Sequence, residues 1–494
     1  EQLRNRREDG EAFSYGFDRS HTINELEEYD NGEASEQELP DEEFSTAGRV
    51  MEIRDFGELV FLDLRDERSD IQVMVRENEE ALETLEEVYR GDFIGVTGNL
   101  TYTDREEFSL KASEVEILTT AVRPIPSDYF GIEDDELRYR DRPLHLTMDM
   151  DARDRFRDRS RIISELRTFL ERDGFMEVET PTIQTVYGGA NAEPFETHIN
   201  DRDMDAYLRI SPELYLKRLI VGGYERIFEV ATDFRNESID RTHNPEFTMM
   251  ELYQAYADYE DMMRITEEMV EHIAEHVLGD TTVEYQGEEI DLSAPWRRMT
   301  MHEAIEEYGG LEVEDMSDEE LREAMDEVGA ELDSEFERGL AIAEIFEEVA
   351  EEELTQPTHI TDYPQETTPL CMDHRSEEGL IERFESFIAG MEIANAYTEL
   401  RDPVQQREHF EEEQRRQEEG DDEAHPLDME FVEALELGMP PTGGLGVGID
   451  RLVMVLTEQA SSRDVRLFPR MGEEEEKHGN NLVSLSGDGY ERKT

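Results

Sequence analysis

Residues 226–259, RIFEVATDFRNESIDRTHNPEFTMMELYQAYADY, combine charged and aromatic side chains at strand-like spacing. Two apolar runs flank a polar loop, which predicts a β-hairpin with a long loop. Because alternate residues of a strand project from the same face, one face would collect a guanidinium, carboxylates and aromatic rings. Buried charges need partners, so this face predicts a binding site, although an exposed, ion-paired face of an antiparallel sheet is the alternative. The side chains concerned are Arg235 and Glu237 after the first strand, and Phe247, Met249, Glu251 and Tyr253 on the second.

A second predicted hairpin, RFESFIAGMEIANAYTEL at 383–400, turns near Ala389–Gly390. Glu385 and Glu392 lie on its two arms near the turn. Two carboxylates at this spacing would suit a hard cation such as Mg²⁺. In so acidic a chain, the alternative is a pair that arises by chance.

The second arm of this hairpin also carries Asn395, Tyr397 and Glu399, which share one parity. Glu392 has the opposite parity, so strict alternation would place it on the other face of the sheet. If all four side chains serve one site, the strand must change parity, and we expect a β-bulge around Ile393–Ala394.

A third segment, TGGLGVGIDRLVMVL at 442–456, passes from a glycine-rich strand directly into a helix. Glycines let the backbone approach a ligand closely, and Arg451 near the start of the helix suits a phosphate. The segment does not match the dinucleotide-binding fingerprint, and ordinary glycine packing is the alternative reading of it.

Together, and in their order along the chain, three strings resemble motifs 1, 2 and 3 of the class II aminoacyl-tRNA synthetases. They are GFMEVETP (174–181), FRNE (234–237) and GLGVGIDR (444–451). Longer strings resemble the lysyl-tRNA synthetases of that class, and the resemblance covers roughly residues 15–470. These are YGGANAEPF (187–195), RISPELYLKRLIVGGYERIFEV (209–230), HNPEFTMMELYQAYADY (243–259) and GMPPTGGLGVGIDR (438–451). The chain departs from the family at Ala394, Ala396 and Ser238, where glycine is usual or frequent.

The resemblance implies a lysine–tRNA ligase that forms lysyl-adenylate from lysine and ATP and transfers lysine to the 3′ end of tRNA(Lys). Arg235 and Arg451 would be the catalytic residues, close to the phosphates. Glu385 and Glu392 would hold Mg²⁺. The implied ATP-binding residues are Arg235, Glu237, His243, Phe247, Glu385, Glu392 and Arg451. The implied lysine-binding residues are Gly189, Glu213, Arg235, Glu251, Tyr253, Asn395, Tyr397 and Glu399, with Glu251 and Glu399 facing the ε-ammonium.

The strand and helix patterns predict the elements that position these residues. Three strands, a helix and two strands between Thr46 and Leu118 predict an OB-type barrel, with another small β domain as the alternative. In the resemblance this barrel binds the anticodon, and Phe61 and Gln72 match the anticodon-reading positions. A core position is the alternative for Phe61. The expected fold class is α+β, an OB-fold barrel followed by an antiparallel sheet flanked by helices.

The expected domains follow this division. They are an acidic extension (1–44), the barrel (45–120), a linker (121–150), the catalytic domain (151–470) with a helical acidic section at about 280–355, and a tail (471–494). The helix that includes Phe156, Ile162 and Leu166 precedes motif 1, which in the family forms a homodimer interface. We therefore expect a homodimer.

Composition limits the remaining possibilities. The 494 residues hold 128 Asp+Glu against 48 Lys+Arg, for a formal net charge of −80. Acids spread over the whole chain predict adaptation to a salt-rich cytoplasm rather than an acidic tail. No run is long and apolar enough for a membrane span, the first residues lack a signal-peptide core, and one cysteine excludes a disulfide within the chain. A cytoplasmic protein with no membrane or DNA partner is expected.

Two other functions remain open from the residues alone. An aspartyl- or asparaginyl-tRNA synthetase shares the architecture, but its pocket calls for a basic residue where this chain offers Glu251 and Glu399. A non-catalytic tRNA-binding paralogue should lack Arg235, Glu392 or Arg451, and all three are present.

Overall fold

The structure is a computed structural model that describes residues 2–9, 13–30, 32, 39–76, 78–126, 135–332, 336–419 and 426–471. The chain divides into two compact units, Glu1–Ala152 and Arg153–Thr494. Apart from Met471, the expected tail lies outside the described residues, as do parts of the expected extension and linker. None of the described helices is long and apolar enough to span a membrane.

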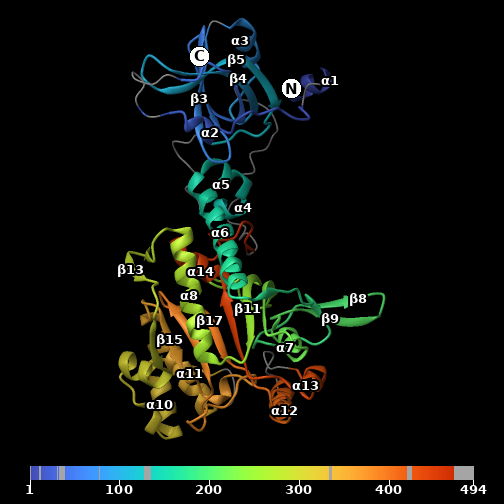
Figure 1. Cartoon of the computed structure of the whole chain (residues 1–494), viewed down its shortest axis with the longest axis vertical. Coiled ribbons are helices and arrows are strands. Elements are labelled where there is room, and N and C mark those ends of the chain that lie inside the picture. Colours follow the sequence, from blue (N-terminus) through green and yellow to red (C-terminus); the bar gives the residue numbers. More distant parts are fainter. Residues whose placement is uncertain are drawn as a thin grey trace. The chain divides into compact units, whose positions relative to one another are not determined.

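The first unit contains a closed five-stranded barrel in the order β1-β2-β3-β5-β4 (Figure 1). Alternating residues of each strand, such as Val60, Leu62 and Leu64, fill its interior. The barrel confirms the expected order of three strands, a helix and two strands. Its elements are β1 (Phe44–Asp55), β2 (Leu59–Arg65), β3 (Asp70–Arg76), α3 (Glu79–Leu85), β4 (Phe93–Tyr102) and β5 (Phe108–Thr119). The same unit also holds α1 (Gln2–Asp9), α2 (Ile23–Glu27), α4 (Asp135–Arg140) and α5 (Arg142–Met148).

The second unit is built on an eight-stranded sheet in the order β14-β15-β16-β17-β18-β11-β10-β6. The pairs β14–β15 and β10–β6 are parallel, and the other neighbours are antiparallel. The strands are β6 (Met176–Glu177), β10 (Arg226–Phe234), β11 (Glu246–Ala255), β14 (Arg297–Thr300), β15 (Thr358–Thr361), β16 (Arg383–Ile388), β17 (Met391–Thr398) and β18 (Thr442–Gly448). A separate sheet is formed by β7 (Ile183–Gln184), β9 (Met204–Leu208) and β8 (Glu196–Ile199).

One face of the large sheet packs on an apolar helical layer. The helices α6 (Met150–Arg172), α8 (Tyr259–Val277) and α14 (Ile449–Leu456) contribute to one buried cluster with Leu252, Leu445 and Val447 of the sheet. The α8 helix begins at a capping box in which Asp258 accepts from the backbone and Asp261 reaches back to it. The opposite face of the sheet is therefore left for polar side chains. The remaining helices are α7 (Glu213–Val221), α9 (Met301–Ala304), α10 (Asp318–Val328), α11 (Arg338–Val349), α12 (Pro403–Glu419) and α13 (Met429–Leu435).

The section at 280–355 is not helical throughout, which corrects the expectation from sequence. It begins with the hairpin β12 (Thr282–Tyr285) and β13 (Glu288–Asp291), followed by β14. Gln286 and Gly287 both have positive φ, 51° and 88°, as a tight two-residue hairpin turn requires. Val283, Tyr285 and Ile290 are buried in the main core, so packing favours strands over helix here.

Candidate active site

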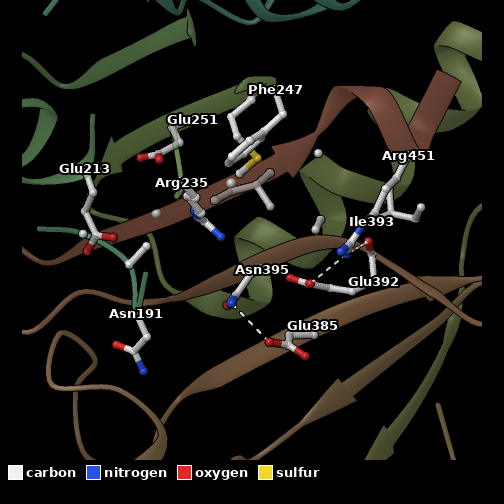
Figure 2. Close-up of a pocket in the computed structure, with 18 of the residues that line it drawn as sticks. Asn191, Glu213, Arg235, Phe247, Glu251, Glu385, Glu392, Ile393, Asn395 and Arg451 are labelled. Atoms are coloured by element: carbon white, nitrogen blue, oxygen red, sulfur yellow. Dashed lines mark hydrogen bonds and ion pairs between the residues drawn. The ribbon is translucent and has the colours of Figure 1, made fainter. Parts of the chain in front are cut away.

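The polar face of the large sheet lines a cavity of about 460 Å³. All of the ATP-, Mg²⁺- and lysine-site residues expected from sequence line it, although they come from segments up to about 260 residues apart. Figure 2 shows Arg451 and Glu392 toward one end of this cavity and Glu213 toward the other. These residues are Gly189, Glu213, Arg235, Glu237, His243, Phe247, Glu251, Tyr253, Glu385, Glu392, Asn395, Tyr397, Glu399 and Arg451.

Strand β18 forms the floor of the cavity between β11 and β17. Gly446 pairs with Glu251 on one side and Asn395 on the other, and Gly444 pairs with Tyr253 and Tyr397. Glycine places no side chain between these flanking residues. The alternation of glycine with buried Leu445 and Val447 therefore gives a trough on one face and a packed core on the other.

The expected change of parity in β17 is confirmed. Ser386 pairs with Ala394, whereas the next residue of β16, Phe387, pairs with Glu392. Ile393 is therefore the extra residue of a β-bulge. The bulge brings Glu392 to the same cavity as Asn395 (Figure 2).

Two arginines, Arg235 and Arg451, line the end of the cavity that is expected to hold phosphates. The Arg235 guanidinium lies 5.0 Å from the centre of the Phe247 ring. Arg451 donates to a Glu392 carboxylate oxygen at 3.0 Å and to its backbone carbonyl at 2.8 Å. The His243 Nε2 atom lies 3.2 Å from Arg451. Fixed guanidinium groups beside an aromatic face suit a ligand with a planar ring and an anionic tail.

Two carboxylates face this end from neighbouring strands. Glu385 accepts from Arg383 at 2.5 Å, from the Tyr363 hydroxyl at 2.8 Å and from Asn395 at 3.2 Å. Burial, helped by the nearby charge of Glu392 and opposed by Arg383, raises the pKa of Glu385 to about 7. A cation placed here would relieve that repulsion, so the oxygen donors fit Mg²⁺.

Three carboxylates surround the opposite end of the cavity. The Tyr397 hydroxyl donates to the Glu213 carboxylate, at the start of α7, and lies 2.8 and 2.9 Å from its two oxygens; Glu213 also accepts from the Lys217 ammonium at 2.5 Å. Glu399 forms an ion pair with the same ammonium. Glu251 accepts from the Ser211 hydroxyl at 2.7 Å and from the Tyr253 hydroxyl at 3.0 Å.

Burial and charge set the protonation of these groups. Burial raises the pKa of Glu251 well above its ordinary value, and the charges of Asp233 and Glu213 raise it further. For Lys217, burial by itself lowers the pKa, but the carboxylates of Glu213 and Glu399 raise it above the ordinary value. Lys217 is therefore a buried, charged ammonium beside the cavity.

Sequence reasoning missed Lys217 and Arg383. Arg383 has the same parity as Glu385 on β16, so strand alternation could have placed it in the site. Lys217 stands four residues after Glu213, a spacing that brings the two side chains together on a helix. The expectation that Glu399 faces the substrate ε-ammonium did not include an ion pair with Lys217.

The barrel carries the two positions expected to read the anticodon. Phe61 alternates with core residues Val60 and Leu62, so it lies on the outer face of β2, and the core alternative is wrong. The Phe56 ring meets it edge-on at 6.4 Å and is itself exposed. Gln72, on β3, accepts a hydrogen bond from Ser109 at 2.9 Å. A half-buried ring on the outer face of β2 with an exposed ring beside it, in the β1–β2 turn, suits base stacking.

Comparisons with known proteins agree with this geometry. Residues 134–472 match the family model described as tRNA synthetases class II (D, K and N), and residues 44–118 match the model of an OB-fold nucleic acid binding domain. The lysine–tRNA ligase of Methanoculleus marisnigri is 48% identical over 93% of this chain and 91% of its own length. Those of Enterococcus faecalis and Clostridium novyi are 47% and 46% identical, over 94% and 92% of this chain and 95% and 90% of their own lengths.

Proposed function

The chain belongs to the class II tRNA synthetases and, among them, to the lysine–tRNA ligases, and from this premise we propose how its cavity activates lysine. The family model alone covers enzymes of three amino acids, so the relatives' names and the cavity's charge carry the choice of lysine. The observation that carries the proposal is the excess negative charge at the far end of the cavity. Three glutamates surround this end, and among the described residues the cation that pairs with them, Lys217, pairs with only two of the three.

ATP would lie over the phosphate end. The adenine would stack on Phe247, and the phosphates would meet Arg235 and Arg451. His243 and Glu237 would add contacts at the cavity's edge. Because Arg451 is already held by Glu392, its guanidinium needs little reorganisation when a phosphate arrives.

Mg²⁺ would be held by Glu385 and Glu392 together with phosphate oxygens. Among the described residues, no group of three or more His, Cys, Asp or Glu side chains is arranged for a metal ion. Two carboxylates plus substrate phosphates are a common arrangement for Mg²⁺. When bound, the ion would neutralise charge on the phosphates.

Lysine would lie along the glycine trough. Its α-ammonium would meet Glu213 and the Gly189 backbone, and its carboxylate would meet Arg235 and Asn395. Gly189 has a φ of 94°, and a Cβ there would lie 2.7 Å from the Ser211 hydroxyl, so the chain needs glycine at this position. Tyr253 and Tyr397 would flank the side chain, and Glu251 and Glu399 would form the end that faces the ε-ammonium.

In the reaction, a lysine carboxylate oxygen attacks the α-phosphorus of ATP. A new P–O bond forms, and the bond to pyrophosphate breaks. No nucleophilic side chain is needed, because Arg235 positions both reacting groups and, with Arg451, stabilises the charge that develops on the phosphates. A hydroxyl of the 3′-terminal ribose of tRNA(Lys) then attacks the lysyl carbonyl carbon, the ester bond forms, and AMP leaves as the bond to its phosphate breaks. Phe61 and Gln72 would contact anticodon bases.

ATP–pyrophosphate exchange with lysine, aspartate and asparagine tests this function. We expect exchange with lysine alone, since a carboxylate or amide side chain would meet the glutamates without a cation to pair with them. Exchange that prefers aspartate or asparagine would contradict the assignment of the pocket, and a protein inactive with all three would support a non-catalytic role. We further propose that the enzyme is a homodimer and that its acidity is an adaptation to high salt.

A further inference from the structure

Lys217 is a fully buried charged residue with no place in the reaction described above. Its side chain is 0% exposed, and its ammonium lies between Glu213, at 2.5 Å, and Glu399. The rings of Tyr397 and Phe431 lie 5.5 and 5.9 Å away. Burying an ammonium costs several kcal/mol unless anions and hydrogen bonds compensate for the lost water. Lys217 has such compensation, and its partners are two residues of the proposed lysine pocket.

The choice of lysine at this position stands out against the composition of the chain. Lysine occurs only four times, at 111, 217, 477 and 493, among 48 basic residues. Within the described part of the chain the other lysine, Lys111, is exposed on β5. An ammonium is compact and donates in three directions, whereas a guanidinium is a wide, planar fork. The small space between two carboxylates therefore suits lysine better than the arginine that this chain uses elsewhere.

The Lys217 ammonium balances part of the negative charge of the pocket. Glu213, Glu251 and Glu399 carry three negative charges when ionised, and lysine brings two ammonium groups to them. The arriving ammonium favours the ionised form of Glu251 against the burial that raises its pKa. Lys217 supplies the third positive charge, so the occupied pocket balances. Within the part of the chain that the structure describes, no Lys, Arg or His forms an ion pair with Glu251, whose partners are the hydroxyls of Ser211 and Tyr253.

We propose that Lys217 is a positioning residue, a built-in counter-ion that neutralises Glu399 and holds Glu213 toward the α-ammonium. Glu251 is then the carboxylate whose charge is left for the ε-ammonium. Glu399 forms the same end of the pocket, but it meets the ε-ammonium with a charge that Lys217 already balances. This inference rests on the lysine pocket proposed above and divides the work among its glutamates.

ATP–pyrophosphate exchange by the full chain tests the proposal, because it follows lysine activation without tRNA. The variants are K217M, E399Q, the double variant K217M/E399Q and E251Q, with K111M as the matched control. We expect K217M to raise the lysine KM by about 100-fold or more, since loss of one partner leaves buried charge uncompensated. The ATP KM should stay near that of the parent, and K111M should change neither constant.

The double variant gives the decisive comparison. Removing Glu399 also removes the charge that Lys217 balances, so K217M/E399Q should recover at least about tenfold of the lost lysine affinity. E399Q alone should raise the lysine KM less than E251Q does. An effect of K217M that is the same with and without Glu399 would overturn the proposal, as would an E399Q defect equal to that of E251Q.

Folding is followed by thermal melts of each variant. If K217M does not fold, a folded and active K217M/E399Q supports the proposal, and a double variant that also fails to fold overturns it. The parent separates this test from the proposed function. A parent without lysine-dependent exchange contradicts the function. An active parent in which K217M has the same effect with and without Glu399 contradicts only the role of Lys217.

Discussion

Buried carboxylates near the phosphate end of the cavity make individual residues sensitive to pH. Burial raises the pKa of Glu351 to about 8, and the charges of Glu347, Glu385 and Glu392 contribute in the same direction. Burial likewise raises the pKa of Glu347 to about 7. These groups keep their protons in the folded protein at pH values where an unfolded chain has lost them. The stability they contribute therefore falls as pH rises through this range.

Replacement of Glu351 by glutamine should give a pH-dependent gain in stability. Between the ordinary glutamate pKa of 4.5 and the raised value of about 8, the parent loses stability and Glu351→Gln does not. We expect the variant's melting temperature to exceed the parent's clearly at pH 8.5 and only slightly at pH 5, without Mg²⁺ or ATP. The exposed neighbour Glu352 provides the control, Glu352→Gln. A gain of equal size at both pH values would contradict the burial of an ionisable Glu351.

At the scale of single elements, the glycines of strand β18 leave room in the cavity because they have no side chains. A Cβ on Gly444 would lie 1.9 Å from a Glu399 carboxylate oxygen and 2.6 Å from the Tyr253 ring. A Cβ on Gly448 would meet only the Ile393 carbonyl oxygen, at 3.7 Å, which is ordinary van der Waals contact. The two positions on one strand therefore differ sharply in the room they leave.

Gly444→Ala should weaken lysine binding more than it weakens ATP binding. The added methyl group must displace Glu399 or Tyr253, and both belong to the lysine end of the trough. We expect the lysine KM to rise by about tenfold or more, as small displacements in binding sites can cost this much. Pyrophosphate exchange with varied lysine and varied ATP measures the two effects. Gly448→Ala, the comparison variant for stability, should melt near the parent's temperature, and an unchanged lysine KM in Gly444→Ala would refute the crowding argument.

At the scale of the whole molecule, a net charge of −80 opposes the binding of RNA. Screening shortens the reach of this repulsion from about 8 Å at physiological salt to about 3 Å at 1 M. Aminoacylation of tRNA should therefore rise from about 0.1 M toward molar KCl, the reverse of the usual dependence. Charging and exchange measured across this range separate tRNA binding from lysine activation. Maximal charging and complete folding in dilute buffer would contradict the proposed adaptation.

Exposed apolar side chains support the proposed homodimer. Leu467 and Phe468 are 45% and 70% exposed, and with Phe156 and Ile163 of α6 they line a second cavity of about 410 Å³. Exposed leucine and phenylalanine side chains beside one another suit a contact between protein chains. Light scattering at molar salt should give twice the mass of one chain, and Phe468→Glu should shift the mass toward that of a monomer. A monomeric parent that retains activity would refute the dimer.

The sequence by itself determined the local patterns of this protein. The alternation of residues predicted the barrel strands, both hairpins and the parity of Glu251 and Tyr253, because the pleat of a strand fixes which side chains share a face. The conflict in parity between Glu392 and Asn395 even predicted the bulge at Ile393. The family motifs then assigned the cavity residues that the fold brings together.

Only the tertiary structure decided which of those side chains touch each other. Lys217 and Glu399 are 182 positions apart, and they meet because Tyr397, near the end of β17, contacts Glu213 and Lys217 of α7. The outward position of Phe61 depended on which face of β2 the barrel buries. The early strands of the section at 280–355 depended on packing of Val283 and Ile290 into the main core. Periodicity describes one element at a time, whereas contacts between distant elements depend on how the whole chain packs, and that packing sets the charge balance of the lysine pocket.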